Sequence, residues 1–255
     1  MGLFFVMLLI DIGNTRLKGA VISKNRRQQF TFPISDVHNR SKLIPIFSEL
    51  LKKHNTTDAL ISSVVPTLNE TVKEIISPLI KGRIYILGPD TDTGVRLATQ
   101  NPTTIGADRI ANAVFAWHET RRASVVVDLG SATTVTVVNG FGELIGGAIL
   151  PGITMMAEAL SEKTGKLPLV KLRQPSRATG ENTENSIISG IIFGTAGAIE
   201  KIVSITKEEL GEEPALFLTG GNATYIKEYL EDSFIYREDL TMKGLEIILR
   251  RLRGE

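Results

Sequence analysis

The sequence predicts an α/β protein made of two similar halves, each built on a mixed β-sheet. The main observation is a repeated segment. Residues 6–18 and residues 124–135 are both aliphatic runs that end in Asp, followed by an apolar residue, Gly and a polar turn. Such a run is typical of a buried strand. Further strands alternate with helices after each copy. The repeat therefore predicts duplicated halves that face each other across a phosphate-binding cleft.

The hydrophobic pattern predicts three strands at the start of each half. Three successive strands can pair as an antiparallel meander, and later β–α–β steps add parallel strands. This order indicates a ribonuclease-H-like domain, present twice, with domains expected at 1–117 and 118–255. In the first half we expect strands 6–12, 17–22, 28–33, 58–64 and 83–87, and helices 40–53 and 67–79. In the second half we expect strands 124–129, 132–138, 143–149 and 214–219, and helices 153–162, 182–208, 222–231 and 240–252.

Composition excludes several kinds of protein. The chain has 255 residues, 42% of them hydrophobic, so it can bury a substantial core. Its formal charge of +1 gives no overall field that favours nucleic acid or an anionic membrane. It has no cysteine, which excludes disulfides, thiolate metal sites and cysteine nucleophiles. No predicted span approaches the length of a membrane helix. We therefore expect a soluble, cytoplasmic protein that binds neither membrane nor nucleic acid.

The two Asp-x-Gly turns carry the first chemical signal. Asn14, Thr15, Ser131, Thr133 and Thr134 offer donors suited to phosphate oxygens. A third element, at residues 216–223, is an apolar strand followed by two glycines, where bare backbone can lie against a flat ring such as adenine. Each element alone could be an ordinary strand and turn. The three in this order resemble the two phosphate motifs and the adenosine motif of the actin, sugar-kinase and Hsp70 superfamily, and this resemblance implies that the chain binds ATP.

A second signal lies at residues 101–112, with the sequence NPTTIGADRIAN. Pro102 disfavours helical geometry at the residue before it, and Gly106 allows close approach at a predicted helix start. Asp108 and Arg109 then fall in the first helical turn. One interpretation is a helix-terminus charge with a surface partner. The other is that Asp108 accepts a proton from an attacking hydroxyl while Arg109 neutralises an anionic group or the transferring phosphoryl.

Together these segments resemble the type III pantothenate kinase family. The resemblance covers nearly the whole chain, from about residue 7 to the last helix. It is carried by DIGNTRLK at 11–18, SSVVP at 62–66, NPTTIGADR at 101–109, DLGSATT at 128–134, GGAILPG at 146–152, KLPLV at 166–170 and LTGG at 218–221.

The resemblance implies a role for each matching residue. Asp108 would be the catalytic base, and the Asp128 carboxylate would help bind a monovalent cation, K⁺ or NH₄⁺. Substrate contacts would come from Gly106, Ala107, Asp108, Arg109 and Thr183. ATP contacts would come from Asp11, Ile12, Gly13, Asn14, Thr15, Arg16, Leu17, Lys18 and Ser131, with Asp11 near the Mg²⁺–nucleotide complex. For Thr183 the alternative is a structural role, with either Asn182 or Thr183 capping the helix.

The implied reaction is ATP-dependent phosphorylation of pantothenate to 4′-phosphopantothenate, the first step of coenzyme A biosynthesis. The resemblance also implies a homodimer with its active site near the subunit interface. The apolar and small residues of the 182–208 helix could serve either that interface or the core. One position departs from the family pattern: Thr99 stands where many members have a tyrosine that encloses the substrate.

Two alternatives stay open on the sequence alone. The same family includes proteins similar to the Bvg accessory factor, so a regulatory protein without kinase activity would keep the fold. Near-neutral charge and the lack of a basic stripe disfavour direct DNA contact. The second alternative is another phosphotransferase of the superfamily, which the NPTTIGADR segment disfavours.

Overall fold

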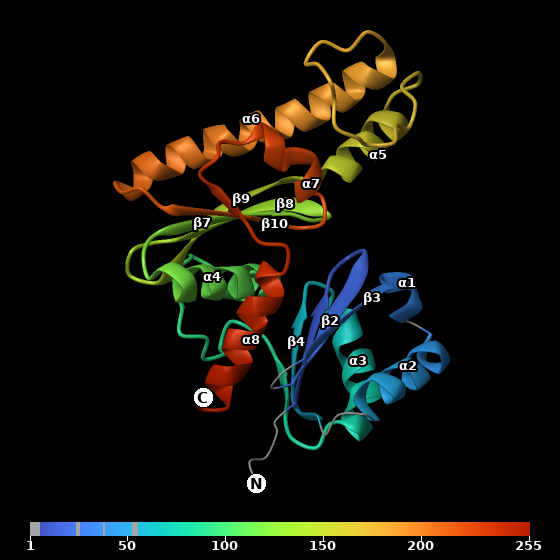
Figure 1. The fold of residues 1–255 in the computed structure, drawn as a ribbon, viewed down its shortest axis with the longest axis vertical. Coiled ribbons are helices and arrows are strands. Elements are labelled where there is room, and N and C mark those ends of the chain that lie inside the picture. The colour runs from blue at the N-terminus through green and yellow to red at the C-terminus, as the bar shows by residue number, and fades with distance from the viewer. Residues whose placement is uncertain (1–5, 24–25, 38, 53–55) are drawn as a thin grey trace. The chain divides into compact units, whose positions relative to one another are not determined.

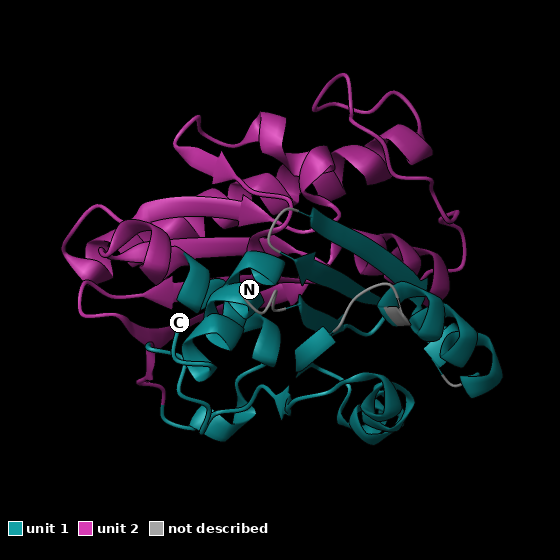
Figure 2. Cartoon of the chain, turned by 60° about the horizontal axis from the view of Figure 1, so that its bottom comes forward, with its two compact units in different colours: residues 1–94, 100–115, 241–255 teal, residues 95–99, 116–240 magenta. Residues whose placement is uncertain are grey.

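The structure is a computed structural model that describes residues 6–23, 26–37, 39–52 and 56–255. The chain divides into two compact units (Figure 2). Unit 1 contains residues 1–94, 100–115 and 241–255, and unit 2 contains residues 95–99 and 116–240. The predicted boundary after residue 117 lies close to the break at 115/116. The prediction for the last helix differs, because that helix belongs to unit 1 from Thr241 onward.

Unit 1 is built on a five-stranded sheet of order β3-β2-β1-β4-β5 (Figure 1). The first three strands are antiparallel neighbours, whereas β4 and β5 run parallel to β1. Alternate apolar side chains of β1 pack with helices α2 and α3 in one core that includes Leu8, Ile10, Phe47 and Val72. The strands are β1 (Val6–Ile12), β2 (Arg16–Ser23), β3 (Arg26–Pro33), β4 (Thr56–Ser63) and β5 (Ile84–Ile86), and the helices are α1 (Ile34–Val37), α2 (Arg40–Lys52) and α3 (Asn69–Ile76).

Two further helices, α4 (Ala107–Thr120) and α8 (Leu240–Leu252), contribute residues 107–115 and 241–252 to unit 1, where they pack closely against each other. A Cβ atom on Gly244 of α8 would overlap with the carbonyl of Ala111 in α4, so the two backbones touch at this glycine. Nearby, Thr241 Oγ1 lies 2.7 Å from Oδ1 of the buried Asn112. Helix α4 thus has its position in unit 1 set by α8, which lies more than a hundred residues later in the chain.

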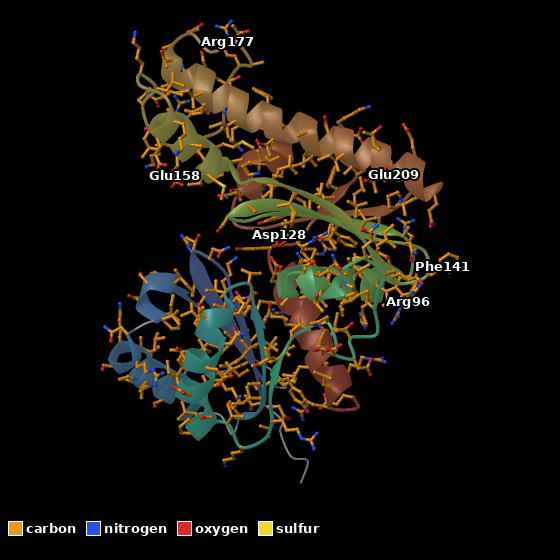
Figure 3. The ribbon with its side chains drawn as sticks, turned by 180° about the vertical axis from the view of Figure 1, so that it is seen from behind. Arg96, Asp128, Phe141, Glu158, Arg177 and Glu209 are labelled. Atoms are coloured by element: carbon orange, nitrogen blue, oxygen red, sulfur yellow. The ribbon has the colours of Figure 1, made fainter. Side chains whose placement is uncertain are left out.

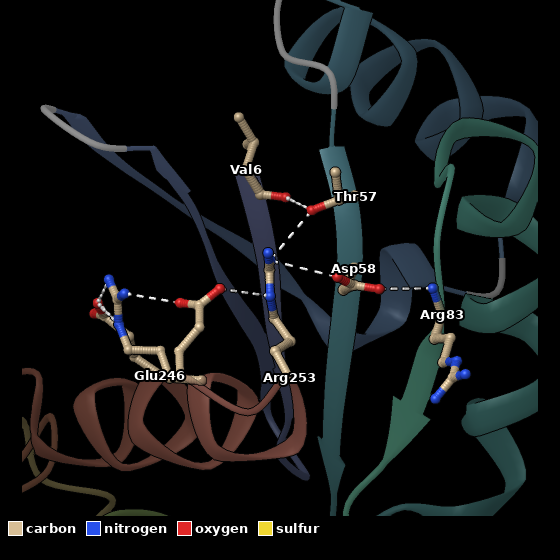
Figure 4. A network of polar contacts seen from close by, with 8 residues as sticks. Val6, Thr57, Asp58, Arg83, Glu246 and Arg253 are labelled. Atoms are coloured by element: carbon tan, nitrogen blue, oxygen red, sulfur yellow. Dashed lines mark hydrogen bonds and ion pairs between the residues drawn. The ribbon is translucent and has the colours of Figure 1, made fainter. Parts of the chain in front are cut away.

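The C-terminal end of unit 1 is held by a polar network (Figure 4). The side chain of Arg253 is only 8% exposed and pairs with Asp58 at 3.3 Å and Glu255 at 2.9 Å. It also donates to Thr57 Oγ1 at 3.2 Å, and Asp58 accepts a bond from the backbone of Arg83. A buried charge is costly unless it is paired, so this network fixes the end of the chain against β4.

Unit 2 repeats the plan with a six-stranded sheet of order β11-β10-β7-β8-β9-β6. Strands β7, β8 and β9 are antiparallel neighbours, and β10 and β11 run parallel to β7. This is the topology of β1, β2, β3, β4 and β5, so the predicted duplication is confirmed. The strands are β6 (Arg96–Leu97), β7 (Ser124–Leu129), β8 (Ala132–Val138), β9 (Glu143–Pro151), β10 (Ala215–Thr219) and β11 (Phe234–Tyr236), and the helices are α5 (Ile153–Lys163), α6 (Thr183–Leu210) and α7 (Ala223–Ile226).

Helix α6 is the main cover of the unit 2 sheet. It begins at the N-cap Asn182, whose side chain accepts a bond from the backbone of Asn185, and ends at Gly211 with φ 67°. Contrary to the sequence expectation, this helix is long and apolar enough to cross a membrane. Half of its most apolar stretch is buried, however, and all its isoleucines except Ile205 belong to the same core cluster as the apolar residues of β7 and β8. That burial is typical of a core helix.

Some predicted elements differ in detail. The helix expected at 67–79 is α3 flanked by 3₁₀ turns, Pro66–Leu68 and Ser77–Leu79. The helix expected at 222–231 is shorter, with α7 continuing as a 3₁₀ turn at Lys227–Tyr229. Strands β6 and β11 and helix α1 have no counterpart in the prediction. They span two to four residues, too few for a hydrophobic period to be recognised.

Candidate active site

The first Asp-x-Gly turn joins β1 to β2 in unit 1. The turn is closed by a bond from Gly13 N to Arg16 O of 3.0 Å. The predicted ATP-binding residues here fall into two groups. Ile12 and Leu17 are fully buried and can reach a ligand only through their backbone. Asp11 is partly buried, and the side chains of Asn14, Thr15, Arg16 and Lys18 are exposed.

The predicted substrate motif at residues 101–109 lies beside this turn, at the same edge of unit 1. Val64, directly after β4, donates its backbone N–H to Ile12 O at 3.0 Å. The position of a Cβ on Gly106 lies 3.5 Å from Val64 Cγ1. The carboxyl ends of β1 and β4 and the start of α4 are therefore neighbours. Asp11 and Asp108, two predicted site residues that are far apart in the sequence, therefore lie at the same edge of unit 1.

Asp108 occupies the first turn of α4 as predicted. Its Oδ1 accepts a bond of 2.8 Å from the backbone N–H of Arg109, which fixes the direction of the carboxylate. A Cβ atom on Gly106 would overlap with this same Oδ1, so a larger residue there would force the carboxylate out of this orientation. The 3₁₀ turn Pro102–Thr104 leads into the helix and is closed by Thr104 Oγ1 on Asn101 O at 2.9 Å.

Burial raises the pKa of the Asp108 carboxyl above its ordinary value. The hydrogen bond from the Arg109 backbone and the positive charge of Arg109 oppose this shift without cancelling it. Burial also lowers the pKa of Arg109, and the charge of Asp108 works in the opposite direction. An arginine keeps its charge throughout, so the pair presents a proton acceptor beside a permanent cation.

The second Asp-x-Gly turn joins β7 to β8 in unit 2, where Figure 3 labels Asp128. The turn is closed by Gly130 N on Ala132 O at 3.1 Å. Ser131 is exposed at its tip. Thr133, by contrast, is fully buried, so the sequence-based expectation that its hydroxyl meets phosphate does not fit its position.

The two-glycine element packs directly on the second turn. Gly220 has φ 99°, and a Cβ atom there would lie 2.5 Å from the backbone of Leu129 and 2.6 Å from Asp128 Oδ1. Asn222 stabilises this contact with two hydrogen bonds of 3.0 Å. Its side-chain Nδ2 donates to Gly130 O, and its backbone N–H donates to Leu129 O. The sequence analysis missed Asn222. Its place directly after the glycine pair is the signal that could have found it.

Thr183 lies at the exposed first position of α6. The capping role belongs to the neighbouring Asn182, whose Oδ1 accepts the Asn185 N–H at 2.9 Å. The two structural alternatives for this pair are thereby resolved in favour of Asn182. Helix capping therefore does not explain the hydroxyl of Thr183.

Comparison with known proteins places the chain in a family. The model of the family described as type III pantothenate kinase matches residues 7–205. The chain belongs to the type III pantothenate kinase family. The type III pantothenate kinase of Syntrophotalea carbinolica is 33% identical, with 98% of this chain and 100% of that protein covered. The corresponding enzyme of Citrifermentans bemidjiense is 36% identical, with 96% and 99% covered.

Solved structures with the same architecture are more distant. An archaeal actin homologue is 15% identical with a TM-score of 0.53, covering 96% of this chain and 99% of its own. MreB 5 of Spiroplasma citri, solved bound to AMPPNP, is 11% identical with a TM-score of 0.54, covering 98% and 97%. At such low identity the similarity shows the fold alone, and it confirms the predicted actin-like, duplicated ribonuclease-H-like architecture.

Membership of the family also confirms the predicted activity class. This member of the family is an enzyme of coenzyme A biosynthesis that phosphorylates pantothenate, and as a kinase it uses ATP.

Proposed function

We propose that the γ-phosphoryl of ATP is transferred to the primary hydroxyl of pantothenate, with Asp108 as the general base. The single observation that carries this assignment is the Asp108 carboxylate itself. It is partly buried, held by the Arg109 N–H, and lies at the same edge of unit 1 as the Asp11 turn. Phosphoryl transfer needs in-line positioning and charge neutralisation more than covalent help. Asp108 would orient the hydroxyl and accept its proton as the new O–P bond forms.

The two Asp-x-Gly turns would hold the nucleotide. In unit 1 the exposed side chains of the 11–18 turn would contact phosphate, and in unit 2 Ser131 would do so from the second turn. Gly220 and Gly221 would leave bare backbone for adenine. The support comes from Gly221, because nothing lies within 4 Å of the position of a Cβ atom there, whereas the space beside Gly220 is filled by the second turn.

The donor set at Asp11 fits a Mg²⁺ ion that arrives with the nucleotide. Mg²⁺ is usually held by one or two carboxylates, by substrate phosphates and by water, not by a cage of protein ligands. Accordingly, the described part of the chain contains no group of three or more Asp, Glu, His or Cys side chains that could hold a metal. When bound, the ion would neutralise charge on the phosphate oxygens, and Asp11 would fix where the nucleotide complex lies.

A monovalent cation, K⁺ or NH₄⁺, is proposed at Asp128. Thr134 lies opposite Asp128 in the β7–β8 pairing, so a hydroxyl oxygen is placed on the same face of the sheet as the carboxylate. Thr134 Oγ1 is buried and has no hydrogen-bond partner among the residues that the structure describes. A weakly hydrated cation beside the Asp128 carboxylate would give that hydroxyl an electrostatic partner.

Pantothenate would be bound by residues 106–109 and by Thr183. Pantothenate carries a carboxylate, and the Arg109 guanidinium has the geometry for such an anion. Thr99, at the position of the common family tyrosine, has a buried hydroxyl with no partner within the described ranges, so it offers a hydrogen bond where an aromatic ring would offer contact area.

A cytoplasmic homodimer completes the proposal. All isoleucines of α6 except the exposed Ile205 belong to the unit 2 core, so the interface would mainly use other apolar groups. Unit 2 exposes Ile149, Met155 and Leu169 on its surface, which supports such an interface. Light scattering of the active protein measures its oligomeric state. A fully active monomer would contradict the proposed homodimer.

The Asp108→Asn variant tests the proposed function. Asparagine keeps the size of the side chain but cannot accept the proton, so we expect turnover to fall by roughly 10²- to 10⁴-fold. Binding of AMPPNP, measured by calorimetry, should persist because Asp108 does not hold the nucleotide. A variant with full turnover would refute the role of Asp108. Wild-type protein that is folded but inactive with pantothenate would favour a regulatory protein or another hydroxyl acceptor.

A further inference from the structure

Ser62 lies beside the first phosphate turn, in a position that the proposed mechanism does not use. It is fully buried near the end of β4, and the pairing of β1 with β4 places it directly opposite Asp11. Its Oγ donates a hydrogen bond of 2.9 Å to Asp11 Oδ1. A buried hydroxyl is expensive to leave unpaired, and this one is paired with the carboxylate proposed to position the nucleotide.

The bond has a chemical consequence for Asp11. A hydrogen-bond donor at one carboxylate oxygen fixes the rotation of the carboxylate plane. Rotation sets the direction in which the oxygen lone pairs meet a cation. Partners that orient a ligand in this way contribute to metal affinity without touching the metal.

The neighbouring serine shows that the contact is specific to Ser62. Ser63 Oγ accepts the backbone N–H of Val65 at 3.0 Å, so it stabilises the turn after β4. Ser62 and Ser63 therefore have different partners, one a carboxylate and the other the backbone.

The second half of the molecule provides a further contrast. Thr219 of β10 is paired with Asp128 as Ser62 is paired with Asp11. Its hydroxyl lies 3.5 Å from the carbonyl of Glu238 and is oriented toward it. The hydroxyls at these equivalent positions of the two sheets therefore have different partners. Only the hydroxyl beside the first turn, that of Ser62, is bonded to the carboxylate opposite it.

We propose that Ser62 is a positioning residue of the kinase, which orients the Asp11 carboxylate toward the Mg²⁺ ion of the Mg²⁺–ATP complex. The inference rests on the role proposed above for Asp11. It predicts that Ser62 affects the Mg²⁺-dependent part of nucleotide binding and leaves pantothenate recognition unchanged.

The test compares Ser62→Ala with Ser62→Thr and with Ser124→Ala. Ser124 is a fully buried serine of β7 whose hydroxyl contacts Thr120 and the Arg122 carbonyl, so it is a control for loss of a buried hydroxyl. AMPPNP affinity is measured by calorimetry with Mg²⁺ and with EDTA, and the rate is measured against Mg²⁺ concentration. Thermal melting confirms that each variant is folded.

We expect Ser62→Ala to weaken AMPPNP binding in Mg²⁺ by roughly 10- to 100-fold, the usual effect of losing a partner that orients a metal ligand. The loss should vanish in EDTA, the KM for pantothenate should be unchanged, and Ser62→Thr should restore binding because it keeps the donor. Ser124→Ala should lower the melting temperature alone.

The double variant with Asp11→Ala separates the possible failures. If Ser62 acts through Asp11, its replacement has no further effect once Asp11 is gone. If Ser62→Ala behaves like Ser124→Ala while Asp11→Ala loses Mg²⁺-dependent binding, the positioning role is overturned and the role of Asp11 stands. If Asp11→Ala binds Mg²⁺ and AMPPNP like wild type, the proposed role of Asp11 fails and the inference fails with it.

Discussion

The environment of Asp108 combines two requirements of a general base. The Arg109 N–H holds the carboxylate in one direction, and burial raises its pKa toward the range in which proton acceptance is useful. Gly106 is part of the same device, because any larger residue would occupy the space of Oδ1. Two features of the motif, Gly106 and the backbone amide of Arg109, therefore act on the same atom, Asp108 Oδ1.

The raised pKa of Asp108 predicts an acid limb in the pH–rate profile. The base works only when ionised, so kcat/KM should fall as the pH is lowered through its pKa in the free enzyme. Because burial raises this pKa, the fall should begin at a higher pH than for an ordinary exposed aspartate. The residual activity of Asp108→Asn serves as the control and should lack the limb. If the acid limb is still present in Asp108→Asn, the limb reports the titration of another group.

At the scale of elements, the site depends on helix packing as much as on turns. Helix α4 presents Asp108, and its position is set by α8 through the backbone contact of Gly244 with Ala111 and by the bond between Thr241 and Asn112. The proposed base is thus positioned by a helix at the far end of the sequence.

A Gly→Ala pair tests this packing. In Gly244→Ala the new methyl group overlaps with the Ala111 carbonyl, so we expect a loss of about 1–3 kcal/mol in the free energy of unfolding and a lower turnover as α4 shifts.

Gly197→Ala is the matched control, because nothing lies within 4 Å of the Cβ position on this exposed face of α6. There alanine should stabilise the helix by roughly 0.5–1 kcal/mol. Chemical denaturation measures both variants. Equal effects of the same sign would contradict the proposed contact between α4 and α8.

At the scale of the whole molecule, the duplication was predictable because the same strand and Asp-x-Gly turn pattern occurs twice in the sequence. Buried strands, Asp-x-Gly turns and the start of α4 at Gly106 follow from hydrophobic runs and turn residues. The membership of α8 in unit 1 does not follow from such patterns. It depends on the contact of Gly244 with Ala111 and on the pairing of Arg253 with Asp58, which join residues that are far apart along the chain.

The candidate site was predictable to a similar extent. Asp11, Asp108 and Asp128 could be proposed as site residues because each follows or precedes a recognisable turn. Ser62 and Asn222 could not be assigned their contacts, because strand register and the stacking of two turns decide them. Likewise, the sequence could not show that Thr133 faces the core while Thr134 faces the Asp128 side of the sheet.

The most direct test of the account is a coupled assay of ADP release by the purified protein with Mg²⁺ and ATP, with and without pantothenate and K⁺. The account predicts ADP release that requires pantothenate and rises with K⁺. ADP release that ignores pantothenate, or none at all from folded protein, would contradict the assignment of this site to pantothenate phosphorylation.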